Sequence, residues 1–287
     1  MRFVQASAKS HPIDRDEPSS GTGGRVVGVV GPGGGSGVTT LAVSLGLAVV
    51  GAGRSVALVD ADPRLGMVAA HLGLGEDRSL FHLVHEATLR PVDHGALGRH
   101  LQSCHGLAVL AGRAEPGSAV GALLPGLEAV LGLLAELHEL ILVDIGPLHS
   151  ETAAAIAFRC QALVWVVDGS TLGADRLDRC LSSSFGRPLR SKPQMVVINR
   201  AGPGLPTRAR EWLAREYGLS LLGLVPSDLA AVRSAEERLL PPVLGGALAS
   251  PLRRAATRMM EVLDGRGTRH HPSGAQASTL RPESSRA

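Results

Sequence analysis

The stretch Val26-Val-Gly-Val-Val-Gly-Pro-Gly-Gly-Gly-Ser-Gly-Val-Thr-Thr40 decides the fold of this chain. Its β-branched residues predict a buried strand over residues 25–30, its glycines predict a tight loop, and the apolar run from Val38 to Val50 predicts a helix. A glycine-rich loop lets successive backbone N–H groups point at one anion, and the N-terminus of the following helix adds its positive end. The stretch therefore predicts a phosphate-binding loop in an α/β fold.

The loop has the layout of a P-loop but not its full chemistry. Against the pattern G-x-x-x-x-G-K-[ST], the window from residue 32 gives Pro32, Gly37, Val38 and Thr39. Valine replaces the lysine that should reach the β- and γ-phosphates, whereas the hydroxyl expected on Mg²⁺, that of Thr39, is present. Because an ordinary strand-to-helix turn also uses glycine, motifs further along the chain have to decide between the two readings.

Two more apolar segments end in carboxylates. Ser55-Val-Ala-Leu-Val-Asp-Ala-Asp-Pro63 predicts a strand that delivers Asp60 and Asp62 at its end, and Leu140-Ile-Leu-Val-Asp144 has the Walker B arrangement. Ligands of parallel α/β sheets bind at the carboxyl ends of the strands. We therefore expect these aspartates to meet the loop at one edge of the sheet. The alternative for each segment is a buried strand that ends in a polar turn.

Four further segments read as strands alternating with helices: 107–110, 162–167, 195–199 and 221–225. The expected fold is a doubly wound α/β domain with a mostly parallel sheet of about seven strands, covering residues 25–264. Residues 1–24 are expected to form a disordered leader and residues 265–287 a disordered polar tail.

The spacing of the loop resembles K-G-G-x-G-K-T-T, the deviant Walker A loop of the MinD/ParA family of P-loop ATPases. Carried over by position, the first lysine falls on Gly33 and the second on Val38, so both are missing. The other positions of the pattern match: Gly34, Gly35, Gly37, Thr39 and Thr40. Further stretches resemble the later motifs of the family: D-x-D-P at 60–63, V-V-x-N-R ending at Asn199-Arg200, and a closing P-x-D turn ending at Asp228.

The resemblance implies a site for ATP and Mg²⁺. Asp62 would orient the attacking water, and Thr39, Asp60 and Asp144 would hold the metal with its water shell. The implied nucleotide-binding residues are Gly33, Gly34, Gly35, Ser36, Gly37, Val38, Thr39, Thr40 and, at the adenine edge, Asn199. Without both lysines, binding is expected to be weak. An active ATPase would need a replacement cation from Arg64, Lys192 or a partner.

Within the family, a loop that lacks both lysines looks most like the actinobacterial relatives of CpaE and TadZ, which occur among Flp/Tad pilus and secretion genes. The resemblance implies a positioning or regulatory factor for a pilus, secretion or septum apparatus. Its partners would be proteins of that apparatus, with a homodimer allowed, and its location the cytoplasm near a pole or septum. Two alternatives stay open: an active ATPase of partitioning type, and a DNA-bound ParA-like regulator.

Charge and composition narrow these alternatives. The net charge is +3, and residues from 251 onward carry seven arginines against three acids, a surplus of 7 − 3 = 4. So small a surplus does not favour DNA as a partner. The chain has no signal-peptide pattern and no uninterrupted apolar run of about 18 residues, so a cytosolic protein is expected. Its cysteines, Cys104, Cys160 and Cys180, are expected to be reduced.

Two segments have competing interpretations. The segment 79–106 carries a group of histidines and one cysteine: His82, His85, His94, His100, Cys104 and His105. Their spacing fits no familiar zinc pattern, so we expect two short amphipathic helices that expose their histidines. The helix expected at 250–263, with Ser250-Pro251 as cap and first turn, either packs on the sheet or contacts a membrane. We favour packing, with any membrane contact weak or indirect.

Overall fold

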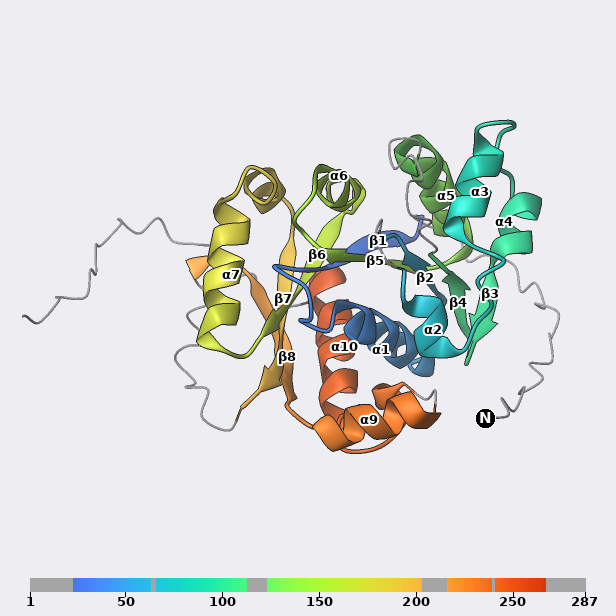
Figure 1. The fold of residues 1–287 in the computed structure, drawn as a ribbon. Helices are drawn as coiled ribbons and strands as arrows, with labels where there is room; N and C mark the ends of the chain where they lie inside the picture. The colour runs from blue at the N-terminus through green and yellow to red at the C-terminus, as the bar shows by residue number, and fades with distance from the viewer. Residues whose placement is uncertain (1–22, 63–65, 113–122, 203–215, 239–240, 267–287) are drawn as a thin grey trace, which may run out of the picture.

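The computed structural model describes residues 23–62, 66–112, 123–202, 216–238 and 241–266. These residues build an eight-stranded sheet with the order β3-β4-β2-β5-β1-β6-β7-β8 (Figure 1). Every neighbouring pair is parallel except β3 and β4. The strands are β1 (Arg25–Gly31), β2 (Val56–Asp60), β3 (Gln102–Cys104), β4 (Leu107–Leu110), β5 (Leu140–Pro147), β6 (Ala162–Asp168), β7 (Gln194–Ala201) and β8 (Ser220–Pro226). The predicted doubly wound, mostly parallel sheet is confirmed.

The strand that the sequence did not predict is β3. It has three residues, too few for an alternating pattern, and it exists through its antiparallel pairing with β4. The turn between them is His105-Gly106, and both residues have positive φ, 50° and 82°. Two consecutive residues with positive φ are what a tight two-residue hairpin requires.

Helices cover both faces of the sheet (Figure 1). On one face lie α3 (Leu80–Ala87), α4 (His94–His100), α5 (Leu123–Leu137), α6 (Glu151–Arg159) and α7 (Thr171–Ser182). On the other face lie α1 (Val38–Gly51), α2 (Val68–Leu72), α9 (Leu229–Arg238) and α10 (Ala249–Leu263). Two short 3₁₀ helices, η2 (Arg187–Ser191) and η3 (Pro242–Leu244), complete the described elements. Pro125 lies in the first turn of α5, where a proline is tolerated.

The central strands are apolar without interruption because both of their faces are buried. In β5, Ile141 and Val143 pack in the layer of α3 to α7, whereas Leu140 and Leu142 pack in the layer of α1 and α10. Since the side chains of a strand alternate between faces, one run of seven buried residues fills both layers. Polar side chains are then left for the strand ends, where the candidate site lies.

The C-terminal helix α10 packs on the sheet, as the favoured interpretation predicted. Leu252, Ala256 and Met259 are buried in the same layer as α1, and α10 contacts β8 and α1. The predicted cap is wrong: α10 begins at Ala249, Leu248 precedes it, and Ser250 lies inside the first turn. In the described part of the chain, no helix is long and apolar enough to cross a membrane.

The two short helices predicted in the histidine segment are confirmed as α3 and α4. His82, His85 and His94 are exposed as expected, but His100 is buried and its Nε2 lies 3.0 Å from Glu86 Oε1. The reason is that α4 packs against α3 and α5, which turns its last residue inward. Within the described residues, no group of three or more histidine, cysteine or acidic side chains could hold a metal ion.

Candidate functional site

The loop between β1 and α1 has the shape that its glycines predict. Gly35 and Gly37 have φ of 77° and 90°, values that residues with a Cβ rarely adopt. Gly37 is also the residue before the first turn of α1, and a Cβ added there would lie 2.5 Å from Asn199 Nδ2. Both the backbone conformation and the close approach of Asn199 therefore require glycine at position 37.

Asn199, from the carboxyl end of β7, braces this loop. Its Nδ2 donates to the carbonyl oxygen of Ser36 at 2.8 Å, and its Oδ1 accepts from the backbone N–H of Arg200 at 3.0 Å. The side chain is 9% exposed. The resemblance assigned this amide to the edge of an adenine. In the structure both ends of the amide are already engaged within the chain, so holding the loop is a contact that Asn199 makes without any ligand.

Asp144 and Thr39 face each other beneath the loop. The Thr39 side chain favours the charged form of the Asp144 carboxylate, and the Gly146 N–H donates to Asp144 Oδ1 at 3.1 Å. Asp144 is fully buried, and among the described residues its Oδ2 has no hydrogen-bond partner. An unpaired buried carboxylate oxygen beside a threonine hydroxyl fits Mg²⁺, which takes one or two carboxylates together with phosphate and water oxygens.

Asp60 lies directly opposite Asp144 on the neighbouring strand β2. Its Oδ2 accepts the N–H of Val68 at 3.0 Å. Gly66 and Gly112 lie so close that a Cβ on either would come within 2.8 Å of the Asp60 carboxylate. Asp60 therefore holds together the backbone that surrounds it, a structural contact that the spacing D-x-D-P did not reveal.

Burial raises the pKa of both carboxylates, since the charged form loses its hydration. The pKa of Asp144 rises to about 8, helped by the negative charge of Asp60, and that of Asp60 rises to about 6 even though backbone N–H groups stabilise its charge. Asp62 reaches the same edge of the sheet, where its Oδ2 lies against the backbone of Gly146. The three aspartates named from sequence are thus brought together at the strand ends, as predicted.

The missing lysines leave distinct surroundings. Val38 is 7% exposed and packs with the apolar layer around α1, so the second lysine position is filled by core. Thr40, two residues on, has its hydroxyl 3.3 Å from His71 Nε2. At Gly34 and Gly35 an added Cβ would meet nothing within 4 Å, which shows that this side of the loop is open.

The hypothesis that Lys192 replaces the missing lysine of the loop is wrong. Its Nζ donates to the carbonyl oxygen of Cys160 at 2.7 Å and lies 4.9 Å from the centre of the Phe158 ring. It precedes β7, whose eight residues span about 25 Å at 3.3 Å per residue, so it sits at the opposite edge of the sheet from the loop. Arg64, the other candidate within the chain, lies outside the described residues.

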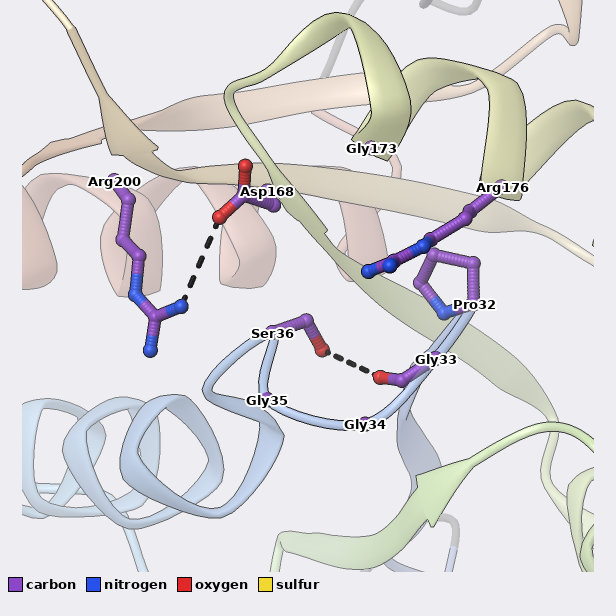
Figure 2. A pocket seen from close by; sticks show the side chains of 9 residues that line it. All are labelled: Pro32, Gly33, Gly34, Gly35, Ser36, Asp168, Gly173, Arg176 and Arg200. Carbon is purple, nitrogen blue, oxygen red and sulfur yellow. Dashed lines mark hydrogen bonds and ion pairs between the residues drawn. The ribbon is translucent and has the colours of Figure 1, made fainter.

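Two arginines that the sequence analysis did not assign to the site line the open side of the loop. Arg176 of α7 and Arg200 at the end of β7 border a small cavity with Pro32 to Ser36 (Figure 2). Arg200 could have been suspected, because it directly follows Asn199 at a strand end. No pattern in the sequence marks Arg176, since its place depends on which face of α7 turns toward the loop.

Comparison with known proteins agrees with this geometry. The family described as the CobQ/CobB/MinD/ParA nucleotide binding domain matches residues 27–242. The chain belongs to this family of nucleotide-binding domains. No curated protein sequence matches it.

Solved structures of the family share the fold. The septum site-determining protein MinD of Pyrococcus horikoshii, solved with Mg-ADP, is similar at a TM-score of 0.68 and 18% identity, covering 85% of this chain and 98% of that one. The cell division ATPase MinD of Pyrococcus furiosus is similar at a TM-score of 0.67 and 20% identity, covering 83% of this chain and 99% of that one. The MinC:MinD cell division protein complex of Aquifex aeolicus is similar at a TM-score of 0.66 and 19% identity, covering 82% of this chain and 96% of that one.

Proposed function

We propose that this protein is a CpaE/TadZ-like positioning or regulatory factor for a pilus, secretion or septum apparatus, and that it works through protein contacts. It would bind Mg²⁺–nucleotide weakly and hydrolyse it negligibly. The observation that carries the proposal is the loop itself. The loop keeps the glycine geometry of a phosphate cradle, but glycine stands at position 33 and a buried valine at position 38. The lysine nearest in sequence to any site residue, Lys192, is at the far edge of the sheet.

The site residues would divide the work as follows. The backbone of residues 33–40 would hold the phosphates, with Asn199 near the adenine. Thr39 and Asp144 would hold Mg²⁺, assisted by Asp60, and Asp62 would orient a water. Bound Mg²⁺ would supply positive charge to the phosphate oxygens. The remaining parts of a hydrolytic site are thus present, and what is missing is a cation held inside the loop.

Work through protein partners is supported by the relatives. MinD of Aquifex aeolicus is found in a MinC:MinD cell division complex. DNA is not favoured as a partner, because the arginines of α10 are engaged locally. Arg253 donates to the Val243 carbonyl, and Arg258 pairs with Glu261 at 2.9 Å. We further propose that residues 25–264 form one domain. Residues 1–22 of the predicted leader and residues 267–287 of the predicted tail lie outside the described residues.

The oligomeric state is expected to be independent of ATP. The MinD/ParA resemblance implies that the first lysine of the loop would cross to the nucleotide of a partner copy, and Gly33 cannot make that contact. Light scattering on the purified protein should give the same mass with and without ATP and Mg²⁺. The matched variant Gly33→Lys/Val38→Lys restores both lysines and is expected to regain a dependence on ATP. A shift of the unmodified protein from monomer to dimer on adding ATP would contradict the proposal.

The proposed role itself is tested by location in the source organism. A fluorescent fusion is expected to form foci at a pole or septum, and Asp62→Ala is expected to leave them unchanged because no hydrolytic cycle drives them. A signal spread over the nucleoid would favour the DNA-bound regulator. A fluorescence distribution that changes with time in the wild type and becomes static in Asp62→Ala would favour the active ATPase. Neighbouring genes give an independent check, since Tad secretion genes favour the proposal and a ParB-like gene the regulator.

A further inference from the structure

A cavity of about 160 Å³ lies on the open side of the glycine loop. Residues of the glycine loop and of β6, α7 and β7 line it: Pro32, Gly33, Gly34, Gly35, Ser36, Asp168, Gly173, Arg176 and Arg200. Its volume is several times the roughly 30 Å³ that a water molecule occupies in the liquid, so a phosphoryl group fits. Figure 2 shows the two guanidinium groups facing this space from opposite sides of the loop.

The charges around the cavity favour an anion. Its one carboxylate, Asp168, lies 3.8 Å from Arg200 Nη1, which is longer than a hydrogen bond. Asp168 thus balances Arg200 only loosely and leaves the charge of Arg176 uncompensated. Among the described residues, Arg176 makes no hydrogen bond or ion pair, whereas Arg179 on the same helix pairs with Asp175 at 2.9 Å. The lining therefore carries a surplus of one positive charge.

The backbone helps to aim both arginines. Arg200 has φ of 53°, a left-handed conformation that is uncommon outside glycine and that often marks a functional position. Arg176 lies three residues after Gly173, which brings it to the same face of α7, above the loop. A Cβ added at Gly33 would lie 3.7 Å from Arg176 Cδ. The stem of Arg176 thus passes beside the position where relatives carry their signature lysine.

We propose that Arg176 and Arg200 form a clamp for the phosphoryl groups of a nucleoside di- or triphosphate bound at the loop. The clamp supplies from the same chain the positive charge that the loop lacks at positions 33 and 38. It rests on the proposed function, because it assumes that the loop accepts a nucleotide. It extends that function by naming what holds the anion. Guanidinium groups suit this task, since they bind phosphate oxygens through two parallel hydrogen bonds.

The test measures binding of a fluorescent ATP analogue and of ADP, both with Mg²⁺, to the full chain. Arg176→Ala is expected to weaken binding about tenfold or more, and Arg176→Lys to weaken it less because the charge stays. Arg179→Ala is the matched control, an exposed arginine one turn away that already has a partner, and its affinity should equal that of the wild type. Gly33→Lys added to Arg176→Ala should recover part of the loss, since it returns a cation to the same space.

The clamp is overturned if Arg176→Ala binds as tightly as the wild type, or if Arg179→Ala loses as much, which would indicate a general charge effect. It is also overturned if the wild type binds no nucleotide at millimolar concentration, or if an acidic peptide displaces the nucleotide from the wild type and Arg176→Ala abolishes peptide binding instead. The proposed function fails on a different result, steady ATP turnover. The two failures are therefore distinguishable.

Discussion

Purified protein incubated with Mg²⁺–ATP is expected to release no phosphate above the spontaneous rate. Phosphoryl transfer depends on positive charge fixed where negative charge grows on the transferring group. The loop offers Gly33 and a buried Val38 at the two lysine positions. Arg176 is exposed and comes from a separate helix, so it can attract a phosphate without being held rigidly against it. Turnover should therefore suffer more than binding.

Variants at position 38 test this reasoning. Val38→Lys is expected to tighten nucleotide binding about tenfold to a hundredfold, the effect of one charge-assisted hydrogen bond, while turnover stays near background. The lysine must leave the apolar packing of Val38 to reach a phosphate, so some stability is lost as well. Val38→Met is the matched control: it is long and uncharged, and it should gain no affinity. Steady ATP turnover by the wild type would contradict the proposed role if Asp62→Ala abolishes it. That result would favour an active ATPase.

The protein without metal or nucleotide is expected to lose stability as the pH rises from about 4 to about 8. The pKa of Asp144 and that of Asp60 are raised in the folded state, to about 8 and about 6, because both carboxyl groups are buried. Between the unfolded and the folded pKa values the folded state keeps protons that the unfolded chain has already released. Each carboxyl group therefore lowers the free energy of unfolding when it ionises in the folded state. The contribution of these two carboxyl groups to stability is fully present below the pKa of an unfolded aspartate. It is lost as the pH rises through the pKa values of the folded state. The loss should be on the order of a few kcal/mol.

Thermal unfolding at pH 5 and pH 8 measures this loss, with an expected fall in the midpoint of roughly 5 °C or more. Asp144→Asn should flatten the pH dependence, because it removes the buried charge and keeps an oxygen for Gly146 and Thr39. Asp175→Asn, at an exposed carboxylate on α7, should leave the dependence unchanged. Mg²⁺ with ADP should stabilise the wild type more at pH 8 than at pH 5 and should do little for Asp144→Asn. An unfolding midpoint of the wild type that does not change with pH would contradict the raised pKa values of Asp60 and Asp144.

Much of the fold follows from local patterns. Seven of the eight strands are apolar runs between turn residues, and burial on both faces makes such runs visible in the sequence. The three-residue strand β3 was not predictable, because it exists only through its pairing with β4. The start of α10 was placed one residue late, because Leu248 rather than a capping side chain precedes it. His100 was expected on the surface, and the packing of α4 against α3 and α5 buries it.

The candidate site shows the same division. The sequence by itself determined the glycine loop, the loss of both lysines and the aspartates at the strand ends, because these depend on residue type and on spacing along one strand or turn. The tertiary structure decided what neighbours those residues. The packing of β7 and α7 beside the loop places Asn199 against Ser36 and Arg176 against Gly33. The direction of β7 leaves Lys192 at the opposite edge of the sheet, on the Cys160 carbonyl. Contacts between residues far apart in the chain, such as the 163 positions that separate Ser36 from Asn199, arise from how strands and helices pack, and no local pattern encodes them.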